Sequence, residues 1–114
     1  MINLNLSMPS NDDHVIIAEL SITPIGSKTT SVSRQVIEAI RAIKSVNGIR
    51  FEVNAMGTVI ESRNLEAVFA AVRAAEEAIF KLGENRVQTI LKIDDRRDKP
   101  TSIERKIESV KKSL

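Results

Sequence analysis

Residues 51–61, FEVNAMGTVIE, decide the fold, because they predict two strands joined by a tight turn. Apolar and polar side chains alternate from Phe51 to Asn54, which is the pattern of a half-buried strand, and the β-branched run 58–60 continues it after Gly57. Glycine takes a positive φ without a steric penalty, so we expect Gly57 to be the pivot of an antiparallel hairpin.

Further elements are predicted on both sides of this hairpin from their apolar periodicity. They are a strand over 14–23, ended by Pro24 and Gly26, a helix over about 31–46, a helix running to about 82, a strand over 86–95 and a last helix that ends the chain. Thr30 or Ser31 is the expected N-cap of the first helix, and Asn64 that of the second. Residues 101–104 have the spacing of a capping box that opens the last helix.

The predicted order β-α-β-β-α-β with an extra C-terminal helix indicates an α+β fold, a ferredoxin-like βαββαβ sandwich around a four-stranded antiparallel sheet. Residues 1–13 are interpreted as an N-terminal extension or edge strand, and residues 14–114 as a single domain. Two helices would cover one face of the sheet. The other face is expected to hold Val15, Ile17 and Ile60, which are costly to leave in water, so a second subunit is predicted there.

Composition narrows the possible chemistry. The 114 residues include no cysteine, which excludes disulfides and thiolate metal sites and favours a cytoplasmic location. His14 is the only histidine, and the sequence has no calcium-loop spacing and no glycine-rich phosphate loop. We therefore expect no enzyme activity, no bound metal and no cofactor. An apolar stretch of the roughly 20 residues that a membrane span needs is also absent.

Positive charge is concentrated at the C-terminal end. Residues 96–114 contain seven basic and three acidic side chains, whereas the chain as a whole has a net charge of +2. A basic tail can bind nucleic acid, but three phenylalanines without Trp or Tyr offer little for base stacking. We instead expect a solvated helix face, with Arg96 and Arg97 paired to Asp94, Asp95 or Asp98.

Four separated motifs resemble the small thiamine-binding protein family. They are VIIAELSITPIG at 15–26, MGTVIE at 56–61, Arg86-Val87, and IDDRRDK at 93–99, so the resemblance covers about 15–114. It implies a ferredoxin-like subunit, a dimer whose sheets join, commonly a tetramer that is a dimer of dimers, and binding of thiamine or a related hydroxymethylpyrimidine without catalysis. The role would be buffering or sensing.

Candidate ligand-binding residues follow from the chemistry of such a ligand, which combines a permanent cation with an aminopyrimidine. A carboxylate can complement the cation, while hydroxyl and amide groups direct hydrogen bonds. The candidates are Glu19, Thr23, Ser31, Asn54, Thr58 and Glu61. Strand alternation does not place all six on one face, because Asn54 and Thr58 straddle the turn and Glu61 is an odd number of residues from Thr58. We therefore rank Glu19, Asn54 and Thr58 above the other three.

Two other functions compete with this hypothesis. The chain could be a structural or regulatory module whose oligomer is the function, without a small ligand. A nucleic-acid-binding domain of the same fold is disfavoured, because the exposed face of the first strand offers Glu19 and Ser21 where such domains place aromatic side chains.

Overall fold

The computed structural model describes residues 14–114, which contain four strands and three helices. In chain order these are β1 (Val15–Pro24), α1 (Ser33–Lys44), β2 (Ile49–Asn54), β3 (Gly57–Ser62), α2 (Leu65–Phe80), β4 (Val87–Arg96) and α3 (Ile103–Lys111). The strands form one antiparallel sheet in the order β2-β3-β1-β4. This confirms the predicted α+β, ferredoxin-like fold with an extra C-terminal helix.

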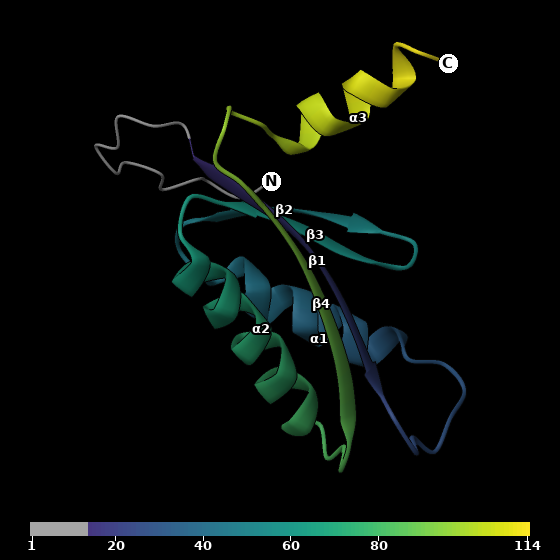
Figure 1. The fold of residues 1–114 in the computed structure, drawn as a ribbon. Coiled ribbons are helices and arrows are strands. Elements are labelled where there is room, and N and C mark those ends of the chain that lie inside the picture. The colour runs from purple at the N-terminus through teal and green to yellow at the C-terminus, as the bar shows by residue number, and fades with distance from the viewer. Residues whose placement is uncertain (1–13) are drawn as a thin grey trace.

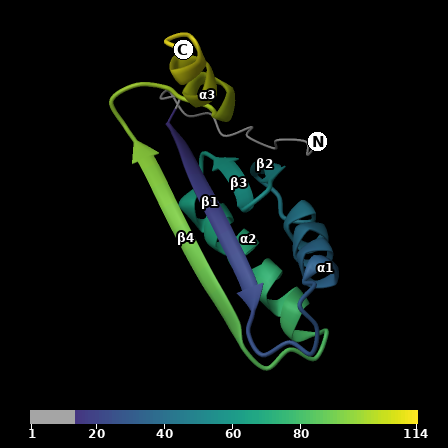
Figure 2. The same ribbon diagram turned by 90° about the vertical axis from the view of Figure 1, so that its right-hand side faces the viewer.

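The three helices lie on opposite faces of the sheet. Helices α1 and α2 pack side by side against one face, and α3 crosses one end of the other face (Figure 1). The long strands β1 and β4 run antiparallel along the length of the molecule, with α3 near one end and the loops that follow β1 and α2 near the other (Figure 2). We call the face that α3 crosses the open face.

Strand alternation in β1 divides its side chains between the two faces. Ile16, Ala18 and Leu20 are buried in the main core beneath α1 and α2. Ile60 of β3 lies opposite Ala18 and belongs to the same core, so its predicted place on the open face is wrong. The error arose because the position of the hairpin turn was misjudged, and a shift of one residue moves every side chain of a strand to the other face.

The hairpin turn lies before Gly57, and not at Gly57 as predicted. Residues 55 and 56 form the turn, and Gly57 is already the first residue of β3, paired with Asn54. Gly57 is not among the glycines with positive φ. Glycine is needed here because the backbones of β3 and β1 lie close together. A Cβ atom at this position would stand 2.9 Å from the carbonyl oxygen of Leu20 in β1.

The helix caps are only partly as predicted. Asn64 caps α2 as expected, since its side chain accepts hydrogen bonds from the N–H groups of Glu66 and Ala67. Helix α1 begins later than predicted, after Val32, which cannot cap it through its side chain. Helix α3 is capped by Ser102, which accepts from the N–H of Arg105, so the reciprocal glutamate of a capping box is missing there.

A second, smaller core joins α3 to the open face. Ile103 is buried against Val15 and Ile17 of β1, with Val59 of β3 packed alongside. Part of the face that was expected to need a second subunit is therefore covered by the chain's own C-terminal helix.

The prediction for residues 1–13 lies outside the described residues, and the division into an extension and one domain stays a prediction. Within residues 14–114, no helix is both long enough and apolar enough to cross a membrane.

Candidate functional site

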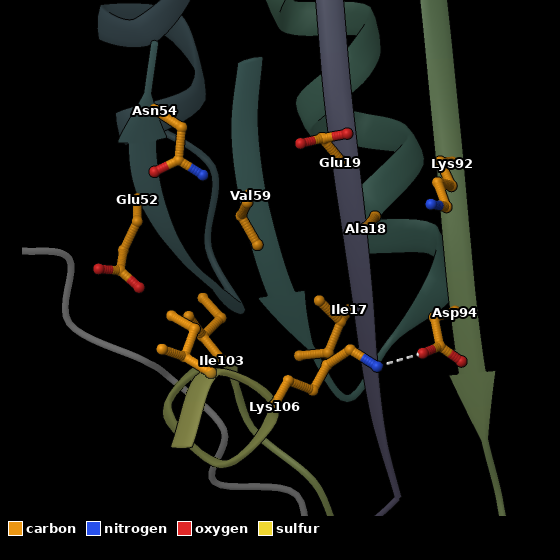
Figure 3. A pocket seen from close by; sticks show the side chains of 11 residues that line it. Ile17, Ala18, Glu19, Glu52, Asn54, Val59, Lys92, Asp94, Ile103 and Lys106 are labelled. Carbon is orange, nitrogen blue, oxygen red and sulfur yellow. Dashed lines mark hydrogen bonds and ion pairs between the residues drawn. The ribbon is translucent and has the colours of Figure 1, made fainter. Parts of the chain in front are cut away.

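A cavity of about 360 Å³, here called the α3 pocket, lies between the open face and α3. Figure 3 shows side chains from all four strands and from α3 around it. The lining residues are Ile17, Ala18, Glu19, Glu52, Asn54, Val59, Lys92, Asp94, Ile103, Lys106 and Ile107. Its volume lies within the range of about 300–1,000 Å³ that is usual for small-molecule sites.

Strand register places the polar side chains of the pocket in rows across the sheet. One row contains Glu52 on β2, Val59 on β3, Glu19 on β1 and Lys92 on β4, each paired with the next. Because neighbouring strands are about 4.8 Å apart, Glu19 and Glu52 start roughly 10 Å from one another, on either side of Val59. The two carboxylates can thus reach different parts of one ligand.

Apolar side chains form the floor of the pocket and the wall opposite it. Ile17 and Val59 supply the floor, and Ile103 lies at the α3 side (Figure 3). Ile107 of α3 also lines the pocket. A largely apolar cavity with a few polar groups is the usual setting for binding an organic molecule, because the apolar walls supply affinity and the polar groups fix its orientation.

Two of the three carboxylates in the pocket have no side-chain partner among residues 14–114. Asp94 pairs with Lys106 of α3, with 2.5 Å between Oδ2 and Nζ, the contact drawn as a dashed line in Figure 3. Glu19 and Glu52 make no side-chain hydrogen bond or ion pair within the described residues. They are therefore acceptors available to a ligand.

Glu61 lies in the neighbouring row and holds α3 in place. Its Oε1 accepts one hydrogen bond from the Arg50 guanidinium at 3.0 Å and one from the backbone N–H of Ile103 at 2.8 Å. Arg50 also donates to Glu104 of α3. This contact lowers the pKa of Glu104, although burial acts in the opposite direction. Glu61, Arg50 and Glu104 together form what we call the α3 latch.

The structure brings two of the six predicted site residues together in the α3 pocket, namely Glu19 and Asn54. Glu61 is 6% exposed and belongs to the α3 latch beside the pocket. Thr58 pairs with Leu20 and is buried among the residues that face α1 and α2. Thr23 is exposed on the open face but near the far end of β1, opposite Gln88. Ser31 lies in the loop before α1, at another cavity.

Several lining residues were not singled out from the sequence. Glu52 lies on the same face of β2 as the predicted Asn54, because the two are two positions apart. Lys92 pairs with the predicted Glu19, so its side chain lies on the same sheet face. An assumed strand register would have identified both residues. Ile103, Lys106 and Ile107 come from α3, and no local pattern in the sequence indicates which face of the sheet that helix crosses.

The ion pairs predicted for the charged segment after β4 are confirmed. Arg96 donates to Asp98 at 2.6 and 2.9 Å, and Arg97 pairs with Asp95 at 3.1 Å. The paired Arg96 lowers the pKa of the Asp98 carboxyl to about 2. Residues 14–114 contain no group of three or more His, Cys, Asp or Glu side chains that could hold a metal ion.

Comparison with known proteins identifies the family of this chain. A family model described as thiamine-binding protein matches residues 18–111. This range contains every residue that lines the α3 pocket except Ile17. The chain belongs to the thiamine-binding protein family. This confirms the resemblance found in the motifs of the sequence.

Individual proteins are similar to this chain over most of its length. The UPF0045 protein of Methanothermobacter thermautotrophicus is 44% identical over 100 residues, which are 88% of this chain and 100% of that protein. The UPF0045 protein YqgV of Bacillus subtilis is 43% identical over 101 residues, which are 86% of this chain and 96% of that protein. The solved structure of the hypothetical protein MJ1052 from Methanocaldococcus jannaschii has a TM-score of 0.77 and 38% identity, covering 85% of this chain and 96% of that one.

Proposed function

We propose that this protein binds thiamine, or a hydroxymethylpyrimidine related to it, in the α3 pocket and does not transform it. The observation that carries the proposal is a pair of carboxylates on an apolar floor beneath α3, Glu19 and Glu52, which have no side-chain partner in the described part of the chain. Membership of the thiamine-binding protein family supports the choice of ligand.

Thiamine matches the pocket in both its charge and its hydrogen-bonding groups. Its thiazolium ring carries a permanent positive charge, and a carboxylate such as Glu19 offsets that charge most effectively when water is displaced from between them. Its aminopyrimidine carries an exocyclic amino group that donates, and carboxylate oxygens only accept. Glu19 and Glu52 can therefore serve the two rings separately.

Asn54 and the apolar residues would fix the orientation of the ligand. The Asn54 side chain offers both a donor and an acceptor, so it can pair with a ring nitrogen or with the amino group. Ile17 and Val59 below and Ile107 above would contact the flat faces of the rings. The role that follows is buffering or sensing in the cytoplasm, because binding alone needs no reactive group.

The direct test is isothermal titration of the full chain with thiamine and with hydroxymethylpyrimidine. Oxythiamine is the matched control ligand, because it replaces the donating amino group with an accepting oxygen. The proposal expects saturable binding of thiamine, the pyrimidine or both, and much weaker binding of oxythiamine, since unpaired polar groups are costly in a desolvated site. Absence of saturable binding for both natural ligands, or equal affinity for oxythiamine, would contradict it.

We also propose that the part of the open face beyond α3 pairs with a second copy of this chain, and that such dimers can pair again into a tetramer. Ile90 of β4 is 59% exposed there, opposite Ser21 of β1. An apolar side chain on a broad, otherwise uncovered sheet face is typical of a symmetric interface. Light scattering should give a mass at least twice the 12.6 kDa of one chain. A monomer at all concentrations would remove this part of the proposal.

A further inference from the structure

A second cavity, of about 540 Å³, lies at the end of β1 that is remote from α3. We call it the loop pocket, because it is formed by the segment between β1 and α1, the first turn of α1 and the segment after α2. These two segments lie together at the end of the molecule opposite α3 (Figure 2). The loop pocket shares no lining residue with the α3 pocket.

Hydrogen-bond acceptors form the inner part of the loop pocket. Gln35 donates from Nε2 to Glu84 at 2.7 Å, and Ser27 donates to the same Glu84 oxygen at 3.3 Å, so both bonds are made to Oε2. Gln35 is only 8% exposed, and its Oε1 is buried without a hydrogen-bond partner among residues 14–114. The amide cannot gain by reversing, because its carbonyl would then face the Glu84 carboxylate.

The unused oxygens of Gln35 and Glu84 point to a ligand that donates hydrogen bonds. A buried amide oxygen without a donor destabilises the folded chain, and the large majority of buried side-chain polar atoms in proteins are paired. An amino or ammonium group would supply donors to this part of the cavity, and Glu84 would complement a positive charge on it.

The outer part of the loop pocket is positively charged. Lys28 and Arg34 line it, are exposed, and have no side-chain partner within the described residues. Helix α1 also begins here, and its N-cap residue Val32 makes no side-chain hydrogen bond to the first turn. The N–H groups of that turn and the positive end of the helix dipole are thus available to an anionic group.

We propose that the loop pocket is a second small-molecule site, for a compound with a hydrogen-bond-donating amino group at one end and a phosphate or carboxylate at the other. The amino group binds at Gln35 and Glu84, and the anionic group at Lys28, Arg34 and the start of α1. Aminoalkyl phosphates and α-amino acids share this chemistry. The site is independent of thiamine binding in the α3 pocket.

The test is isothermal titration of the full chain with O-phosphoethanolamine, which has an amino group and a phosphate but no pyrimidine, with L-serine and with inorganic phosphate. Four variants are compared with the original chain. Arg34→Gln removes an exposed charge of the loop pocket, and Gln35→Met removes the buried amide at similar volume, with folding checked by thermal melting. Arg41→Gln is the matched control, because Arg41 is exposed on the same helix but pairs with Glu38 outside the pocket. Glu19→Gln reports on the α3 pocket.

One of the two bifunctional probes should bind at least about tenfold more tightly than inorganic phosphate, since only it engages both ends of the pocket. Arg34→Gln should weaken that probe about tenfold, and Gln35→Met should weaken it without changing the affinity for phosphate. Arg41→Gln and Glu19→Gln should leave it unchanged. Which probe binds identifies the ligand class. The proposal is overturned if neither probe binds better than phosphate, if Arg34→Gln has no effect, or if Glu19→Gln weakens binding as much as Arg34→Gln does.

Discussion

Glu61 Oε1 accepts a 2.8 Å hydrogen bond from the backbone N–H of Ile103, so a buried carboxylate of β3 holds the first residue of α3. The carboxylate is suited to this position, because the N–H groups of a first helical turn have no partner within the helix and the dipole favours negative charge there. Glu61 thereby fixes the helix that forms one wall of the α3 pocket.

Glu61→Gln should loosen α3 while leaving the main core intact. The variant keeps the shape of the side chain but loses the charge that Arg50 and the helix terminus complement, so we expect the free energy of unfolding to fall by about 1–3 kcal/mol. Urea denaturation measures this change, and hydrogen exchange should show faster exchange in α3. Glu108→Gln is the control, because Glu108 is an exposed residue of the same helix and lies outside the α3 latch. Equal stability of the two variants would show that the Glu61 contact does not hold the helix.

The small core beneath α3 depends on a single isoleucine of that helix. Ile103 is 4% exposed, whereas Ile107 one turn later is 47% exposed. Ile103→Ala should therefore cost about 2 kcal/mol of unfolding free energy, at the lower end for buried isoleucine because this core is small. Ile107→Ala should cost less than about 1 kcal/mol. Similar values for the two variants in urea denaturation would mean that Ile103 is not the anchor.

The α3 latch should weaken in acid through Glu104. Arg50 lowers the pKa of this carboxyl below its ordinary value of 4.5, so the ionised form is favoured in the folded chain. Its contribution to stability is thus fully present above pH 4.5 and is lost as the pH falls through the lowered pKa. The effect is small, since the Glu104 side chain is 61% exposed.

Thermal melting of the original chain and of Glu104→Gln at a series of pH values isolates this contribution. The original chain should melt at the higher temperature near neutral pH, and the difference should shrink below pH 4.5 as Glu104 becomes protonated. A difference that stays constant over this pH range would show that the charge of Glu104 does not contribute.

The N-cap of α2 was identified from the sequence, and its energetic role can be measured. Asn64→Ala removes the side-chain oxygen that accepts from the N–H groups of Glu66 and Ala67, which should cost about 1 kcal/mol. Asn47→Ala is the control, because Asn47 is exposed and precedes β2 outside any helix. If both substitutions have the same effect in urea denaturation, the cap is not responsible.

The fold could be predicted because its signals are local. Alternation in β1, the apolar stripes of the helices and the cap at Asn64 each depend on neighbouring residues, and the order of elements then restricts the topology. The start of α1 was misplaced for a related reason. Several serines and threonines precede Val32, each a plausible cap by residue type, yet the helix begins after a residue that cannot cap it.

The site was harder to predict because it depends on register and on a distant helix. Glu19 and Asn54 were placed together, but Thr58 faces the main core, since the turn is formed by residues 55 and 56 and β3 begins at Gly57. That one-residue difference exchanges the two faces of a strand. Nothing local in the sequence indicates that Glu61 would bind the start of α3, because the two segments are 42 residues apart.

The central claim is that the α3 pocket binds thiamine through its carboxylates, and titration of Glu19→Gln with thiamine tests it most directly. Removing the charge at constant shape should weaken binding by about 1–3 kcal/mol, because Glu19 lines a largely apolar pocket and makes no side-chain hydrogen bond or ion pair within residues 14–114. Glu77→Gln, an exposed carboxylate on α2 remote from the pocket, should bind thiamine like the original chain. Unchanged affinity in Glu19→Gln, with the fold intact by thermal melting, would contradict the account.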